Sequence, residues 1–159
     1  MPEQIRDYIT GQLLPLTSEE AVRQEFERIL IDEMGYPRSH MDIEFPIQRG
    51  SKRRSERADI VIFRDEWRDQ KNIYMIVEIE SPGHPFDDQV FSYATATTAE
   101  FVVWFDGLDR KKSQGAKYFN RDMATDPTKF VEIPTLPRSG ESIEEIGKYR
   151  KSQLQELRS

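Results

Sequence analysis

The sequence predicts an α/β fold with a mixed central sheet of about four to five strands, flanked by helices. Two observations lead to this prediction. Three runs rich in β-branched and aromatic residues follow one another through short polar loops, which indicates an antiparallel meander. A helical stripe then separates the third run from a fourth. A strand, a crossover helix and another strand normally place the two strands parallel.

The composition is that of one highly charged domain. The chain has 159 residues, of which 36% are hydrophobic and 33% charged, enough for a domain with its own core. No apolar run approaches the roughly 18 residues of a membrane span, and the first residues lack a signal-peptide pattern, so we expect a cytoplasmic protein. The absence of cysteine excludes thiolate sites, and with only two histidines a metal ion would be held by oxygen ligands, which suit Mg²⁺ or Mn²⁺.

Two helices are predicted at the start of the chain. Residues 3–14 place apolar side chains on one side of a short helix. A longer amphipathic helix is predicted over 18–34. Thr17, followed three residues later by Glu20, is a capping-box pattern, and Gly35 ends the helix.

The three strands of the meander are predicted over 41–47, 58–63 and 73–80. The first contains Pro46, which suits an edge position because proline donates no hydrogen bond to a neighbouring strand. Its alternating apolar residues are expected on one face. These residues are Ile43, Phe45 and Ile47.

The crossover helix is predicted over 86–97 and the strand that follows it over 101–105. Proline at 85 is acceptable in the first turn of a helix. Five residues form the stripe that would face the sheet. They are Phe86, Val90, Tyr93, Ala94 and Thr97.

The last third of the chain is less regular. Residues 130–133 form another short predicted strand, so we assign 1–133 to the domain. Residues 134–159 are predicted to be a Pro/Gly linker and a polar C-terminal helix over 141–158. The apolar stripe of that helix is thin, so we expect it to lead into a missing C-terminal region. A natural short tail is the alternative.

Three carboxylates at the ends of two predicted strands are the strongest indication of function. They are Asp59, Glu78 and Glu80. Glu78 and Glu80 project to the same side because side chains alternate along a strand. Two like charges about 4 Å apart repel by on the order of 4 kcal/mol at a surface-like dielectric, so a cation or open solvent must offset them. We predict a divalent-metal site, with solvated acids as the alternative.

Basic residues precede Asp59 although the formal net charge is −6. Those expected to contact DNA phosphates are Lys52, Arg53, Arg54 and Arg57. Such contacts depend on the local field rather than on the net charge. A second basic cluster follows the fourth strand. It contains Arg110, Lys111, Lys112, Lys117 and Arg121. A solvated loop is the equal alternative for each cluster.

The motifs occur in an order that resembles a known family. They are Glu20-Ala21-Val22-Arg23-Gln24, Gly35-Tyr36-Pro37, Arg57-Ala58-Asp59-Ile60-Val61, Val77-Glu78-Ile79-Glu80 and Gln89-x-x-x-Tyr93. Over residues 15–110 this order resembles the N-terminal nuclease domain of type I restriction enzyme R subunits, in the PD-(D/E)XK nuclease superfamily. The resemblance implies a restriction-endonuclease-like fold and a Mg²⁺-dependent endonuclease. It further implies double-stranded DNA and other restriction-modification subunits as partners.

The resemblance also implies roles for individual residues. Asp59 and Glu78 match the metal-binding acids, and the backbone carbonyl of Ile79 would complete the coordination. Gln89 and Tyr93 match the QxxxY motif, and their i, i+4 spacing puts both on one helical face near the acids. A core tyrosine beside a surface glutamine is the alternative for this pair.

Glu80 departs from the family, which normally has a lysine at this position. Glu80 could bind a second metal ion or act as general base, and we count it among the catalytic residues. Lys71, or a cation from 52–54, could replace the lysine. The domain is therefore either an active nuclease or a degenerate module that binds DNA or partner subunits without cleaving. A protein-interaction domain with merely exposed acids is a third hypothesis.

Overall fold

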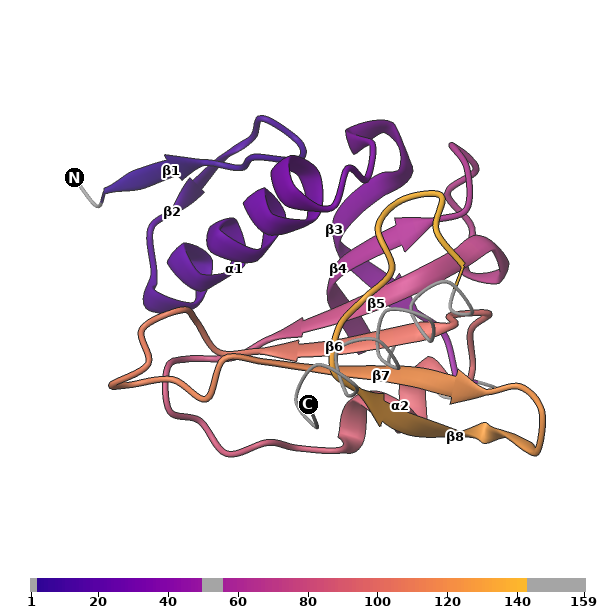
Figure 1. Ribbon diagram of the computed structural model, residues 1–159. Coiled ribbons are helices and arrows are strands. Elements are labelled where there is room, and N and C mark those ends of the chain that lie inside the picture. Colours follow the sequence, from indigo (N-terminus) through magenta and orange to yellow (C-terminus); the bar gives the residue numbers. More distant parts are fainter. Residues whose placement is uncertain (1–2, 50–55, 143–159) are drawn as a thin grey trace, which may run out of the picture.

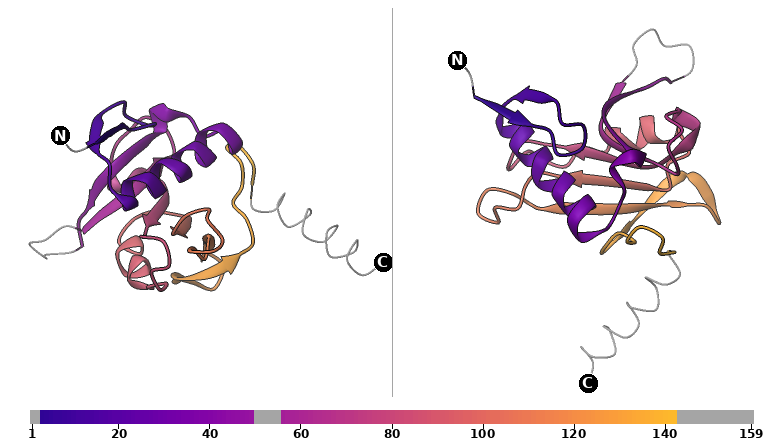
Figure 2. Two further views of the ribbon diagram at one scale, coloured as in Figure 1. Left: turned by 90° about the vertical axis from the view of Figure 1, so that its left-hand side faces the viewer. Right: turned by 90° about the horizontal axis from the view of Figure 1, so that it is seen from above.

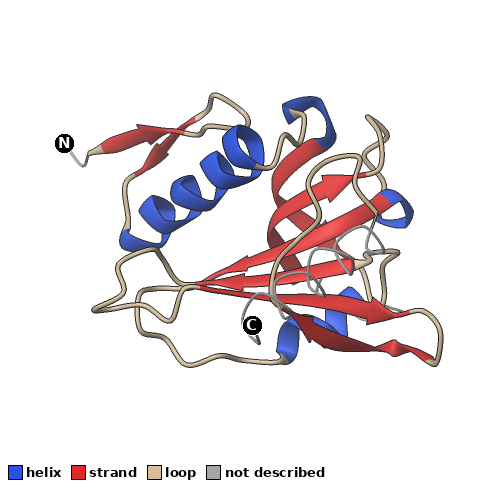
Figure 3. Ribbon diagram, viewed as in Figure 1, coloured by secondary structure: helices blue, strands red, loops and turns tan. Residues whose placement is uncertain are grey.

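A six-stranded mixed sheet forms the centre of the molecule (Figures 1 and 3). The computed structural model describes residues 3–49 and 56–142. The strands are β3 (Met41–Ile47), β4 (Glu56–Phe63), β5 (Ile73–Ile79), β6 (Phe101–Phe105), β7 (Ala116–Asp122) and β8 (Asp126–Ile133), in that spatial order. All neighbours are antiparallel except β5 and β6, which are parallel. The predicted fold class, meander and crossover are confirmed, with six strands in the sheet instead of four to five.

Helix α1 (Ser18–Arg28) begins as its capping pattern predicts. The Thr17 hydroxyl accepts a hydrogen bond of 3.0 Å from the backbone N–H of Glu20. A π-helical turn, η1 (Ile29–Glu33), continues the helix. Gly35 then takes a φ of 77°, a left-handed conformation that only glycine adopts without strain, and the chain leaves the helix there.

The two α-helices cover opposite faces of the sheet (Figures 1 and 2). The α1-side core joins Val22 and Phe26 of α1 and Leu30 of η1 to inward residues of five strands. Those strand residues include Ile60, Val77, Ile79, Val103 and Phe105. Helix α2 (Gln89–Ala94) covers the other face, where its buried residues meet the α2-side core of Ala58, Val61, Ile76 and Val102. Sheet residues buried on both faces explain the nearly continuous apolar runs of β5 and β6.

The helix predicted over 3–14 is wrong, because these residues form a hairpin beside α1 (Figure 2). Strand β1 (Gln4–Arg6) pairs antiparallel with β2 (Leu13–Pro15). Gly11, at a φ of 77°, reverses the chain between the strands. The Asp7 carboxylate also accepts a 2.7 Å hydrogen bond from the N–H of Thr10, a turn geometry that competes with the helix.

The alternation of side chains along β3 breaks at Glu44, so the prediction of one shared apolar face is wrong. Glu44 has a φ of 48°, which is strained for a residue other than glycine. Ile43, before it, packs against the α1-side core, whereas Phe45 and Ile47 belong with the α2-side core. On β4 the alternation breaks at Asp59. Ala58, before it, belongs to the α2-side core, whereas Ile60, after it, belongs to the α1-side core. Strain of this kind often marks a functional site.

The remaining elements differ from prediction mainly in length. Helix α2 has six residues, so Phe86 lies ahead of it and stacks on Phe119 instead. Strand β7 was not predicted, and β8 begins earlier than the predicted 130–133. The short helices η2 (Arg38–His40) and η3 (Gln70–Asn72) lie in loops. No helix in the described part of the chain has the length and apolar content to cross a membrane.

The proline-rich stretch after β8 folds back onto the domain. Leu136 is buried, and the carbonyl of Pro137 accepts a 2.6 Å hydrogen bond from the Tyr36 hydroxyl. The N–H of Ser139 bonds the carbonyl of Met34 at 2.9 Å. Most of the predicted helix over 141–158 lies outside the described residues.

Candidate functional site

The antiparallel pairing of β4 and β5 brings Asp59 and Glu78 together. Ile60 lies opposite Val77, so the preceding Asp59 falls at the level of Glu78 on the neighbouring strand. The N–H of Ile79 donates a 2.7 Å hydrogen bond to Asp59 Oδ2. Two acids nineteen residues apart in the sequence thus occupy one end of the sheet.

Tyr93 of α2 contacts Glu78, but Gln89 contacts neither acid. The Tyr93 hydroxyl donates a short hydrogen bond to Glu78 Oε2. Tyr93 is buried, and this bond fixes the orientation of the Glu78 carboxylate. Gln89 is the first residue of α2, where its side chain is exposed and forms no hydrogen bond to any described residue.

The environment of Asp59 and Glu78 disfavours two negative charges. Burial raises the pKa of Asp59, against the hydrogen bond from Ile79, which lowers it. Burial and the neighbouring Asp59 charge raise the pKa of Glu78, and the bond from Tyr93 offsets this only in part. Asp59 Oδ1 and Glu78 Oε1 accept no hydrogen bond from the described residues. Asp59, Glu78 and Glu80 do not form a group of three with ligand oxygens all within 4.8 Å of one another. Asp59 and Glu78 are nevertheless neighbouring, underneutralised carboxylates with a free oxygen each, and such oxygens are the ligands that Mg²⁺ prefers.

Glu80 lies just beyond β5 and at the margin of this pair. Its N–H continues the ladder by bonding the carbonyl of Phe105 at 2.9 Å. Its carboxylate lies 3.6 Å from Nε2 of His84. Burial raises the pKa of Glu80, and His84 acts in the opposite direction. Glu80 also adds to the negative potential at Glu78, so it belongs electrostatically to the site.

A cleft of about 240 Å³ runs from Asp59 toward α1 and the N-terminal hairpin. Its lining consists of Leu14, Pro15, Thr17, Glu19, Glu20, Arg23, Glu44, Asp59 and Ile79. Glu19 contributes repulsion at Asp59, Glu78 and Glu80. Sequence reasoning missed Glu19 and Glu44. The packing of α1 on the sheet brings Glu19 to the acids, whereas Glu44 lies across from Asp59 in the pairing of β3 with β4. The left-handed backbone of Glu44 is not visible in the sequence.

Arg23 is the basic residue in the lining of this cleft. Its guanidinium is held by Glu20, with bonds of 2.5 and 3.1 Å, and it lies 3.7 Å from Glu44. The side chain is 5% exposed, so little water screens its charge. That charge acts to lower the pKa of Asp59, which makes Arg23 a counter-charge to the acids.

A second acidic cluster ties the hairpin to α1 behind the cleft. Oxygens of Asp7, Glu20 and Glu27 lie within 4.8 Å of one another. The side-chain nitrogen of Gln24 donates to both Asp7 Oδ1 and Glu20 Oε1 at 2.8 Å, so an amide already fills the space between them. We therefore assign this cluster a structural role and no metal ion.

Protonation of Glu27 lowers the negative charge of this cluster. Glu27 is fully buried, its Oε1 accepts from the N–H of Ile9, and its Oε2 has no donor among the described residues. Burial and the adjacent Asp7 raise the pKa of Glu27 to about 9. Burial opposes ionisation of Asp7 as well, but hydrogen bonds from Glu27, Gln24 and Thr10 lower its pKa overall. Glu27 is thus the partner that favours the protonated form, and Arg23, whose Nε lies 3.8 Å from Glu27 Oε2, lowers its pKa only in part.

Only some of the cations singled out in the sequence lie in the described part of the chain. Arg57 is exposed on β4, two residues before Asp59. Lys52, Arg53 and Arg54 lie outside the described residues. Lys71 precedes β5, whereas Glu80 follows it, and seven strand residues span about 20 Å. Lys71 therefore cannot replace the lysine that the resemblance leads one to expect at Glu80.

Comparison with known families agrees with this geometry. Residues 18–137 match the type I restriction enzyme R protein N terminus. The match covers well over half of the 159 residues and includes Asp59, Glu78, Glu80 and Tyr93. No curated protein and no solved structure matches the chain. The chain belongs to the family of type I restriction enzyme R protein N-terminal domains.

Proposed function

We propose that this domain is a Mg²⁺-dependent endonuclease of a type I-like restriction system, hydrolysing phosphodiester bonds of double-stranded DNA. The family places the chain in a restriction context. The observation that carries the proposal is the pairing of Asp59 and Glu78 on adjacent strands, partly buried and insufficiently neutralised beside a cleft.

Asp59, Glu78 and the carbonyl of Ile79 would hold the metal ion. A divalent ion bound there polarises a phosphoryl oxygen and makes a bound water acidic enough to attack at neutral pH. The Ile79 N–H fixes Asp59 through its 2.7 Å hydrogen bond, and Tyr93 fixes Glu78. Both carboxylates are thereby oriented before a ligand arrives, which avoids reorganisation during the reaction.

Glu80 and Arg23 have opposite tasks in this proposal. The raised pKa of Glu80 makes its carboxylate a candidate base that accepts a proton from the attacking water. Arg23 lines the cleft with its charge directed at the acids, where it would oppose the negative charge that develops on the phosphate. It occupies the role that a lysine at position 80 would otherwise fill.

A module that binds DNA or partner subunits without cleaving is the second candidate. The observation in its favour is Glu80 itself, which places a negative charge where the resemblance leads one to expect a positive one. The contact between Glu80 and His84 at 3.6 Å would then be only structural.

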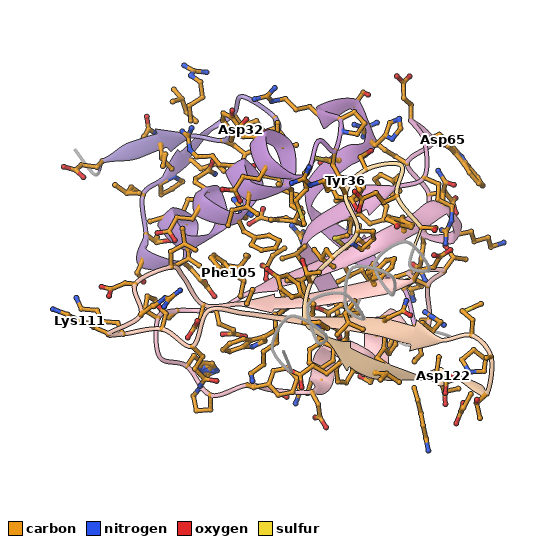
Figure 4. The ribbon with its side chains drawn as sticks, viewed as in Figure 1. Asp32, Tyr36, Asp65, Phe105, Lys111 and Asp122 are labelled. Atoms are coloured by element: carbon orange, nitrogen blue, oxygen red, sulfur yellow. The ribbon has the colours of Figure 1, made fainter. Side chains whose placement is uncertain are left out.

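Cleavage of supercoiled plasmid with Mg²⁺ or Mn²⁺ separates the two candidates. We expect nicked or linear product from the wild-type protein and a loss of about 100-fold or more for Asp59→Asn. Asp122→Asn is the matched control, since Asp122 is the last residue of β7 at the opposite end of the sheet (Figure 4). Equal activity of Asp59→Asn and wild type would contradict the proposal. An inactive wild type that still binds DNA would favour the binding module.

A further inference from the structure

The turn between β6 and β7 is built around one buried acid. Asp106 is 0% exposed and follows β6 directly. Its carboxylate accepts from the N–H groups of Gly83 (3.1 Å), Gln114 (2.9 Å) and Gly115 (2.7 Å). One side chain therefore fixes the end of this turn and also joins it to the segment that follows β5.

Further contacts hold the turn from both sides. The N–H of Leu108 bonds Glu25 of α1 at 3.1 Å. Asp109 bonds the following backbone, including the N–H of Lys112 at 3.0 Å. Gly83 packs so closely that an added Cβ would lie 2.9 Å from the carbonyl oxygen of Lys112. A turn held at this many points presents its side chains in a defined place.

Three consecutive cations project from this fixed turn, namely Arg110, Lys111 and Lys112, and all three are exposed. They lie at the same end of the sheet as the acids. Gly83 touches Lys112 and is only three residues after Glu80, a separation of at most about 10 Å along the chain. Figure 4 shows Lys111 at this end, whereas Asp65 and Asp122 mark the opposite end.

We propose that the basic turn of Arg110, Lys111 and Lys112 is a contact for the DNA phosphate backbone beside the cleavage site. The inference rests on the proposed function in taking duplex DNA as the ligand. Each strand carries one phosphate per about 3.4 Å of helix axis, so 10 Å corresponds to about three nucleotides. A duplex engaged at Asp59 therefore presents several successive phosphates to this end of the sheet, where the basic turn lies.

The electrostatics of the site make such a contact necessary. The formal net charge is −6, and Glu19, Glu44, Glu78 and Glu80 surround Asp59 with further negative charge. Phosphates approaching this end of the sheet are repelled unless cations lie within about one Debye length, roughly 8 to 10 Å at physiological salt. The basic turn supplies three exposed cations at this end of the sheet.

The test is the salt dependence of binding to a short DNA duplex. Binding is measured by fluorescence anisotropy between 50 and 200 mM salt without divalent metal, using Lys111→Ala/Lys112→Ala. Each lost phosphate contact reduces the slope of log K against log salt by about 0.9, so we expect a reduction of about 1.8 and at least tenfold weaker binding. The matched control is Lys71→Ala/Lys129→Ala, which removes the same charge from exposed residues elsewhere. For this control we expect affinity within about twofold of wild type.

An unchanged slope, or equal losses in both double variants, would overturn the inference. A single-stranded RNA of equal length serves as competitor, and preferential loss of RNA binding would also overturn it. Plasmid cleavage separates this outcome from failure of the proposed function. If the slope is unchanged but cleavage depends on Asp59, only the proposed DNA contact of the basic turn is refuted. If the slope is reduced but the protein does not cleave DNA, the DNA contact is supported and the proposed nuclease activity is refuted.

Discussion

Replacing the buried Glu27 with glutamine should remove a pH dependence from the stability of the domain. The pKa of Glu27 is raised from 4.5 to about 9 in the folded protein. Between these values the folded chain holds a proton that the unfolded chain has released. The contribution of Glu27 is therefore fully present below pH 4.5 and is lost as pH rises toward 9.

The magnitude follows from proton linkage. One proton costs about 1.4 kcal/mol per pH unit, so Glu27 lowers the free energy of unfolding by up to about 4 kcal/mol between pH 5 and pH 8. Asp7 adds no slope there, because its lowered pKa leaves it ionised in both states. Glutamine cannot ionise, and its amide can donate to Asp7 as the protonated acid does.

Urea unfolding at pH 5 and pH 8 measures the effect. The free energy of unfolding of Glu27→Gln minus that of the wild-type protein should be several kcal/mol larger at pH 8 than at pH 5. Subtracting the wild-type value from the variant value at each pH cancels the contributions of the groups that both proteins share. Glu33→Gln, at an exposed glutamate of the same helical segment, is the control and should show no such change. An identical difference at both pH values would refute the raised pKa of Glu27.

Three further predictions concern strain, the site and the core. Glu44→Gly should be about 1 kcal/mol more stable than Glu44→Ala by urea unfolding, because only glycine accepts a φ of 48° without strain; equal stability would contradict this. Tyr93→Phe removes the hydrogen bond to the Glu78 carboxylate and should raise the Mg²⁺ concentration for half-maximal cleavage about tenfold or more. An unchanged Mg²⁺ concentration would contradict the orienting role of Tyr93. Phe26→Ala should cost about 3 to 5 kcal/mol, because Phe26 is fully buried with its ring centroid 4.8 Å from that of Phe105; a loss below 1 kcal/mol would contradict this packing.

The sequence predicted best those elements whose signal is local. Strands form over 41–47, 58–63 and 101–105 as predicted, and the strand predicted over 73–80 ends one residue earlier, at Ile79, because β-branched and aromatic side chains suit a pleated, buried surface. The cap at Thr17 was predicted from a motif whose hydrogen bond involves only neighbouring residues.

The errors arose where tertiary contacts decide. Residues 3–14 have helical apolar spacing, yet the pairing of Ile5 with Leu14 and the turn at Gly11 favour a hairpin. Strand β7 alternates irregularly and carries several polar residues, so only its pairing with β6 makes it a strand. Such effects of distant neighbours override local propensity.

The candidate site shows the same division. Asp59 and Glu78 could be predicted because each ends an apolar run, and their pairing follows from a meander. Arg23 and Glu44 could not be placed beside them, since their positions depend on how α1 lies over the sheet and on one strained residue.

Calorimetric titration with Mn²⁺ tests most directly whether Asp59 and Glu78 form a metal site. The wild-type protein should bind Mn²⁺, Glu78→Gln should lose that binding, and Asp122→Asn should retain it. Replacing a carboxylate with an amide removes the charge while preserving the shape, so the loss reports ligation and not packing. No binding by the wild-type protein, or equal binding by Glu78→Gln, would contradict the account.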